Sequence, residues 1–252
     1  GDVPGIIGAK PVHHLKEGER KSVLDIDAMF IDVGAVSKGE AMDEFGIAPG
    51  DPVVPRTGFT TLRNPRFVSG KAFDDRAGVA LFVDALKTIR AGEHPNTICG
   101  VGTVQEEVGL KGAKTSAYGL DPDVALVSEV TIPGDHPELS KEQRHVAIGK
   151  GPVITVVDAN GRGLIVPRPV LAWLRAAADG AGIPYQLDVA SGGTTDGTSI
   201  HLTRSGIPTG VVSVPTRYLH SPIEVLSLED LERGAELIAR AKSGEMDPLI
   251  GR

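Results

Sequence analysis

From about residue 67 onward, strand-like and helix-like patterns alternate along the chain, and this alternation constrains the fold most. The segment DDRAGVALFVDALKTIRAG places Val79, Phe82, Leu86 and Ile89 at helical spacing, and NTICGVGTVQ follows as a predicted buried strand. Further strands are predicted in DVALVSEV, IPYQLDVA and IPTGVVSVP, and further helices near 112–119 and in RPVLAWLRAAADGAG, TSIHLTRSG and LEDLERGAELIARAKSG. This order predicts an α/β fold over 67–252, with a mixed, largely parallel sheet flanked by helices.

Residues 1–66 have a different texture, with short strand-like runs and many turn residues. A capping box, Ser37-x-x-Glu40, opens a short helix that ends at Gly46. The stretch that follows is punctuated by prolines and rich in strand formers. We therefore predict a smaller β-rich domain over 1–66.

Composition excludes several classes of partner. The net charge of -7 argues against nucleic acid and against an anionic membrane surface, and aromatic residues make up only 4%. The sequence contains no apolar run long enough to cross a bilayer and no opening signal peptide. Cys99, the single cysteine, lies in an apolar stretch, so we expect a small buried side chain and a cytoplasmic location.

Acidic residues and one histidine follow the apolar strand runs. Asp74-Asp75, Glu106-Glu107, Glu129 and His220 each come directly after or close to such a run. Because ligands bind beyond the carboxyl ends of strands in open α/β sheets, these side chains are expected to share one crevice. Converging carboxylates need a cation, and carboxylate with imidazole suits zinc, cobalt or manganese.

Glu106 and Glu107 are adjacent, and consecutive strand side chains point to opposite faces. We therefore predict a turn at Gly109, with one glutamate binding metal and the other taking a proton from the attacking water. Each feature also has a simpler reading: a glutamate pair often lies on a solvated helix face, and a pair of aspartates before a helix is often an N-cap. The residues alone leave these readings open.

Four motifs together resemble the glutamyl aminopeptidase family of cytosolic dinuclear metallopeptidases, whose members often form tetrahedral dodecamers. They are GKAFDDRAG, TVQEEVGLKGA, GGTTDGTSIHLTRSGIPT and SVPTRYLHSPIEV, and the similarity runs over essentially the whole chain. The resemblance implies a zinc-peptidase-like fold in which Asp74 bridges two metal ions. It further implies that Glu107 and His220 complete one site, that Glu129 binds the other ion, and that Glu106 is the general base.

The resemblance also implies a cis peptide between Asp74 and Asp75, and it places Asp196 at the cleft without a role. It implies two divalent ions per subunit (Zn or Co, or else Mn), short peptides as substrates for removal of N-terminal residues, and homo-oligomers built through residues 1–66. Family members carry a His-x-Asp motif ahead of the position where this chain starts. We therefore expect the Glu129 site to lack an imidazole ligand, so that one of the two ions is absent. We also expect both domains to lack their first segments.

Two other functions are also considered, one because the His-x-Asp motif is missing from this sequence and one because carboxylates converge. An inactive or partly active fragment would serve as an assembly or binding protein, with one metal ion or none. A two-carboxylate glycoside hydrolase, an endoglucanase, would need an aromatic-lined cleft, which one Trp and three Tyr do not favour.

Overall fold

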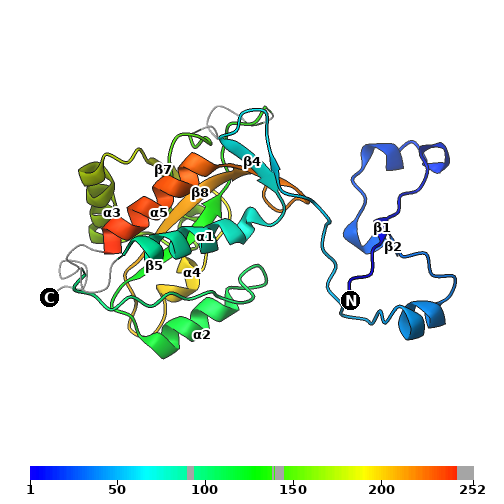
Figure 1. Ribbon diagram of the computed structural model, residues 1–252, viewed down its shortest axis with the longest axis horizontal. Helices are drawn as coiled ribbons and strands as arrows, with labels where there is room; N and C mark the ends of the chain where they lie inside the picture. Colours follow the sequence, from blue (N-terminus) through cyan, green and yellow to red (C-terminus); the bar gives the residue numbers. More distant parts are fainter. Residues whose placement is uncertain (90–93, 138, 140–144, 243–252) are drawn as a thin grey trace. The chain divides into compact units, whose positions relative to one another are not determined.

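The structure is a computed structural model that describes residues 1–89, 94–137, 139 and 145–242 (Figure 1). The chain divides into two compact units, Gly1–Val54 and Pro55–Arg252. This division precedes the predicted boundary at residue 66, because β3 (Thr60–Thr61) pairs antiparallel with β4 (Phe67–Gly70) inside the larger unit. The assignment of residues 1–66 as an oligomerisation domain stays a prediction.

The smaller unit contains one two-stranded antiparallel ribbon and several short helical turns. Its elements are β1 (Ile6–Ile7), η1 (Val12–His14), η2 (Glu19–Lys21), η3 (Ile26–Ala28), β2 (Ile31–Asp32) and η4 (Glu40–Glu44). The capping interaction is present: the Glu40 N–H donates to Ser37 Oγ at 3.1 Å, and Glu40 Oε2 accepts from the Val36 N–H at 2.6 Å. None of residues 1–54 is fully buried, so this unit has no apolar core of its own.

A mixed seven-stranded sheet forms the centre of the larger unit. Its strands run in the order β3-β4-β9-β8-β6-β7, and β5 pairs with β8. The strands not yet given are β5 (Ala125–Thr131), β6 (Val153–Val157), β7 (Gln186–Val189), β8 (Thr209–Arg217) and β9 (Glu224–Ser227). The prediction of a mixed α/β sheet is confirmed.

The further prediction that this sheet is largely parallel is wrong. The pairs β5–β8 and β6–β7 are parallel, whereas β3–β4, β4–β9, β8–β6 and β8–β9 are antiparallel. Short connections join β3 to β4 and β8 to β9, and a short connection permits only antiparallel neighbours.

Helices flank this sheet (Figure 1). They are α1 (Phe73–Thr88), α2 (Lys111–Leu120), α3 (Arg168–Ala181), α4 (Gly197–Ile200) and α5 (Leu228–Lys242), with the short turn η6 (Ala159–Gly161) after β6. Helices α1 and α5 lie side by side in close contact, since a Cβ on Gly234 of α5 would be 2.7 Å from Leu81 Cδ2 of α1. Leu81, Ile154 and Leu237 are fully buried in the core between sheet and helices.

The buried face of α1 differs from the predicted one. Val79 is 46% exposed, and the buried residues are Phe73, Ala77, Gly78, Leu81 and Ala85. The reason is the close approach of α1 to β5, because a Cβ on Gly78 would be 2.5 Å from the Ser128 carbonyl oxygen. The small residue Gly78 therefore faces β5, whereas Leu81 packs against α5 at Gly234.

The predicted buried strand in NTICGVGTVQ is not formed. Residues 96–105 contain no strand, and Cys99 is exposed, which corrects its predicted burial. The segment lies instead against the flank of α1, since a Cβ on Gly100 would be 2.9 Å from the ring of Phe82 and 3.2 Å from Leu86. The apolar side chains of Val101 and Val104 are nevertheless 39% and 67% exposed, and none of residues 96–105 pairs as a strand among the described residues.

Candidate metal centre

Three of the predicted ligands meet at one point in the larger unit. Asp74 lies in the first turn of α1, Glu107 precedes α2, and His220 lies between β8 and β9. His220 Nε2 is 3.2 Å from Asp74 Oδ2 and 3.7 Å from Glu107 Oε2, and one ligand atom from each of the three residues lies within 4.8 Å of the others. Two carboxylates and one imidazole at these separations fit one divalent cation of the zinc, cobalt or manganese type.

A turn separates the two adjacent glutamates, as predicted. The Glu106 carbonyl accepts from the Gly109 N–H at 3.0 Å and from the Leu110 N–H at 2.9 Å. Gly109 has a φ of 118°, and Gln105 and Leu110 are also left-handed, with φ of 59° and 56°. Glu107 joins Asp74 and His220, whereas Glu106 lies outside that group of three.

The turn that presents His220 is anchored just ahead of it. Arg217, the last residue of β8, donates from Nε and Nη2 to the two carboxylate oxygens of Asp135, at 2.8 and 2.6 Å. Tyr218 and His220 then adopt left-handed backbone conformations, with φ of 66° and 59°. The bidentate Arg217–Asp135 pair therefore fixes where this strained turn begins.

Glu129 lies beside the group of three and contacts its neighbour Asp75. Its side chain is 7% exposed, shares a hydrogen bond with the Asp75 carboxyl, and accepts from the Val130 N–H at 3.1 Å. Asp75 also accepts from the Gly78 N–H at 2.9 Å. The Asp74–Asp75 peptide is cis, as the resemblance implies. The role of Glu129 as ligand of a second ion stays a prediction.

The carboxyl groups of this region carry raised pKa values. Burial and the charge of Glu107 raise the pKa of Asp74 to about 6, against the opposite effect of His220. Burial, followed by the charges of Asp196 and Glu107, raises the pKa of Glu106 to about 7. Burial likewise raises the pKa values of Asp75 and Glu129. A cluster of carboxyls this unfavourable to ionise is what a bound cation would relieve, so the residues present fit a metal ion.

Asp196 is a further acidic residue of this region, and no role was predicted for it. It precedes α4 and is 7% exposed, and its Oδ2 accepts from Thr103 Oγ1 at 2.6 Å. Its Oδ1 is buried without a hydrogen-bond partner among the described residues. The charge of Asp196 is one of the causes of the raised pKa of Glu106.

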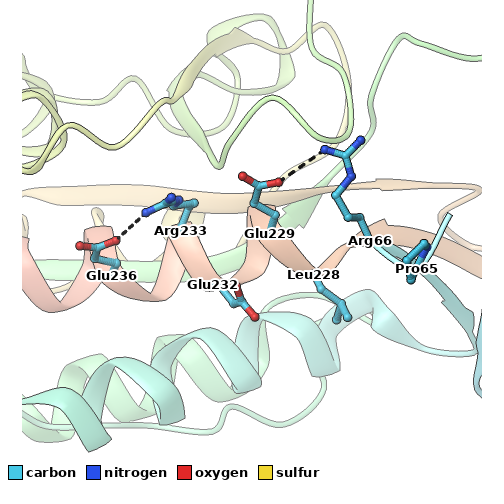
Figure 2. Close-up of a pocket in the computed structure, with 7 residues that line it drawn as sticks. All are labelled: Pro65, Arg66, Leu228, Glu229, Glu232, Arg233 and Glu236. Carbon is cyan, nitrogen blue, oxygen red and sulfur yellow. Dashed lines mark hydrogen bonds and ion pairs between the residues drawn. The ribbon is translucent and has the colours of Figure 1, made fainter.

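A separate hollow of about 550 Å³ lies where β4 approaches α5. Figure 2 shows two ion pairs among its charged side chains: Arg66 contacts Glu229 at 4.0 Å, and Arg233 contacts Glu236 at 3.3 Å. None of the predicted site residues lines it. The hollow is thus separate from the acidic cluster.

The fold and the carboxylate–imidazole group define the class of this protein as a mixed α/β protein with a candidate site for a divalent metal ion. The family described as M42 glutamyl aminopeptidase matches residues 1–237. The chain therefore belongs to the M42 glutamyl aminopeptidase family, a family of metal-dependent aminopeptidases, and the family prediction is confirmed.

Solved structures agree with this assignment. Aminopeptidase APDkam598 from the archaeon Desulfurococcus kamchatkensis is 43% identical, with a TM-score of 0.89, over 96% of this chain and 65% of its own. A TET aminopeptidase from the marine sediment archaeon Thaumarchaeota archaeon SCGC AB-539-E09 is 41% identical, with a TM-score of 0.89, over 98% and 68%. The TET1 peptidase of Pyrococcus horikoshii is 35% identical, with a TM-score of 0.79, over 96% and 68%. The chain thus spans about two thirds of the length of these relatives.

Among the described residues, no helix has the length and apolar character required to cross a membrane.

Proposed function

We propose that this chain removes N-terminal residues from short peptides with the help of a divalent metal ion held by Asp74, Glu107 and His220. The observation that carries the proposal is the convergence of these three ligand atoms within 4.8 Å, from three separate segments of the chain. A bound ion of this kind polarises the scissile carbonyl and makes the attacking water more acidic.

Glu106 is proposed as the general base that accepts the proton of the attacking water. It is adjacent to a proposed ligand but free of the group of three, and the turn after it fixes its backbone. Its pKa of about 7 is close to neutral pH, which suits a group that must accept and then release a proton.

Asp74 and Glu129 are proposed to hold a second ion, giving two per subunit, with zinc, cobalt or manganese as the metal. Burial of Glu129 beside Asp75 supports a cation on that side of Asp74. Assembly into a homo-oligomer is also a proposal. It is supported by the similar TET1 peptidase of P. horikoshii, which can assemble into a tetrahedron or a large octahedral shell. A cytoplasmic location stays a prediction from the single cysteine.

A glycoside hydrolase is not favoured. Such an enzyme needs two carboxyl groups separated across a sugar. Here the carboxylates of Asp74 and Glu107 both approach His220, which is an arrangement for a shared cation.

The test is peptide hydrolysis by the protein as purified, after chelation, and after return of Co²⁺ or Zn²⁺. We expect chelation to abolish release of the N-terminal residue from a short peptide, and metal to restore it. The same peptide with an acetylated N-terminus is the matched control, and it should remain intact. His220→Ala should lose both bound metal and activity, because one of three ligands is gone.

Chelator-resistant release of the N-terminal residue would contradict the metal-dependent mechanism. Chelator-resistant hydrolysis of a glucan would favour the endoglucanase. A folded oligomer with one ion or none per chain and no turnover would favour the assembly or binding protein.

A further inference from the structure

We propose that Glu224 is a positioning residue that holds the backbone of Asp74, so that the Asp74 carboxylate is directed at the metal. Glu224 is the first residue of β9 and is only 2% exposed. Its Oε2 accepts from the Phe73 N–H at 2.5 Å and from the Asp74 N–H at 3.2 Å. This inference rests on the proposed function, since it assumes that Asp74 is a metal ligand.

The Phe73 and Asp74 N–H groups at the start of α1 find their acceptor outside the helix, in Glu224. The backbone is non-helical at Asp74 (φ -78°, ψ 105°) and at Asp75 (φ -119°, ψ 51°), and the regular helix after this kink is capped by Asp75, whose Oδ1 accepts from the Gly78 N–H at 2.9 Å. The first N–H groups of a helix have no partner within the helix and require one from elsewhere. Glu224, which is 150 residues away from Asp74, supplies this partner to the two N–H groups ahead of the kink.

Strand register delivers Glu224 to this position. In the antiparallel pair β4–β9, Glu224 lies opposite Gly70, three residues before α1 begins. Glu224 is therefore supplied by a hydrogen-bonded strand of the sheet. A residue supplied by a paired strand is held more precisely than one supplied by a loop.

His220 and Glu224 contact Asp74 from two directions. His220 Nε2 is 3.2 Å from the side-chain Oδ2 of Asp74, while Glu224 Oε2 accepts from its backbone N–H. One short segment, HSPIE, thus provides both a proposed ligand and the support of another ligand. Outer groups of this kind orient metal ligands, and their loss weakens metal binding.

The test compares three substitutions of Glu224 in the whole chain by titration with Co²⁺ against a competing chelator. Glu224→Met removes the acceptor, and we expect Co²⁺ affinity to fall about 10–100-fold. Glu224→Asp keeps the charge but is one methylene shorter, and we expect a loss in the same direction. Glu224→Gln keeps a carbonyl oxygen for the two N–H groups, and we expect it to retain most of the wild-type affinity.

Ser227→Ala is the matched control. Ser227 is also buried on β9, and its Oγ accepts from the Asp230 N–H of α5 at 3.4 Å, remote from the proposed ligands. We expect its thermal midpoint to fall while Co²⁺ affinity is unchanged. Thermal midpoints of all variants in the metal-free state separate a general loss of stability from a specific loss of metal binding.

Wild-type Co²⁺ affinity in Glu224→Met, with only a lowered thermal midpoint, would overturn the inference and leave the proposed function intact. If Glu224→Met does not fold, Glu224→Asp decides in the same way. Wild-type protein that binds no Co²⁺ would overturn both the proposed function and this inference.

Discussion

At the scale of single residues, the two adjacent glutamates are expected to differ in what they contribute. In Glu106→Gln the amide keeps the shape of the side chain but cannot accept a proton. We expect kcat to fall by about 10²–10⁴-fold, the range typical for loss of a general base, with KM and metal content unchanged. Steady-state kinetics and elemental analysis of the same sample measure both quantities.

Loss of metal together with activity in Glu106→Gln would instead make Glu106 a ligand. An unchanged kcat would remove it from the mechanism. Glu107→Gln is the comparison variant, and it should lose metal, because Glu107 Oε2 is one of the atoms near His220 Nε2.

Residues whose role depends on local sequence were predictable, and those that act across the chain were not. The turn after Glu106 follows from two like charges in a row and a glycine three positions later. Glu224 could not be assigned, because its partners are backbone N–H groups of a helix 150 residues away, and nothing in SPIEV reveals that register. No separate role could be predicted for Asp75 beyond its place in the Asp74-Asp75 pair. Its contact with Glu129 depends on how α1 packs against β5.

At the scale of elements, α2 is held close to the segment that carries the two glutamates. A Cβ on Gly112 would lie 2.4 Å from the Val104 nitrogen and 2.5 Å from its oxygen, and the Gly112 N–H donates to that oxygen at 2.9 Å. Gly112→Ala must therefore push backbone apart. We expect a loss of about 1–3 kcal/mol in the free energy of unfolding, as for other overpacked sites, and weaker metal binding because Glu107 shifts.

Gly119 in the same helix is the matched control, since a Cβ there would meet nothing within 4 Å. Gly119→Ala should raise the free energy of unfolding by up to about 1 kcal/mol, the difference in helix propensity. Urea unfolding of both variants measures the two effects. Equal effects of the two substitutions would show that the contact between α2 and Val104 is not a close one in solution.

The elements that sequence pattern predicted best are those with a face against the sheet. Helix α5 and strands β5 and β8 lie where their periodicity placed them, and Ser227 Oγ accepts from the Asp230 N–H in the first turn of α5. Residues 96–105 have a strand-like composition but contact the flank of α1, and composition does not distinguish a strand from a segment that packs through side chains. Strand direction also escaped prediction, because it depends on the short connection between β8 and β9.

At the scale of the whole molecule, the acidic cluster makes stability depend on pH when metal is removed. The pKa values of Asp74 and Glu106 are about 6 and 7 in the folded chain, above the values of about 4 usual for an unfolded chain. Both groups thus bind protons more tightly when folded. Their contribution to stability is present below about pH 4 and is lost as pH rises through 6 and 7.

We therefore expect the thermal midpoint of the metal-free protein to fall between about pH 5 and pH 8. Metal keeps the ligands ionised and adds about 2.7 kcal/mol of stability at a 100-fold excess over Kd, so the loaded protein should show no such fall. Calorimetry with and without chelator gives both curves. Parallel curves for the two states would contradict a cation at this cluster. In the metal-free protein, Glu129→Gln should make the fall in thermal midpoint less steep, because burial also raises the pKa of Glu129.

The long sequence separation between Asp74 and its two contacts, His220 and Glu224, also has a consequence for folding during synthesis. A ribosome exposes Asp74 early, but His220 and Glu224 are synthesised well over a hundred residues later. Contacts of such long sequence separation form late in folding, because closing the intervening loop costs entropy before the contact rewards it. A nascent chain thus has no complete cation site until β9 has paired with β4, so metal uptake would report the completion of folding.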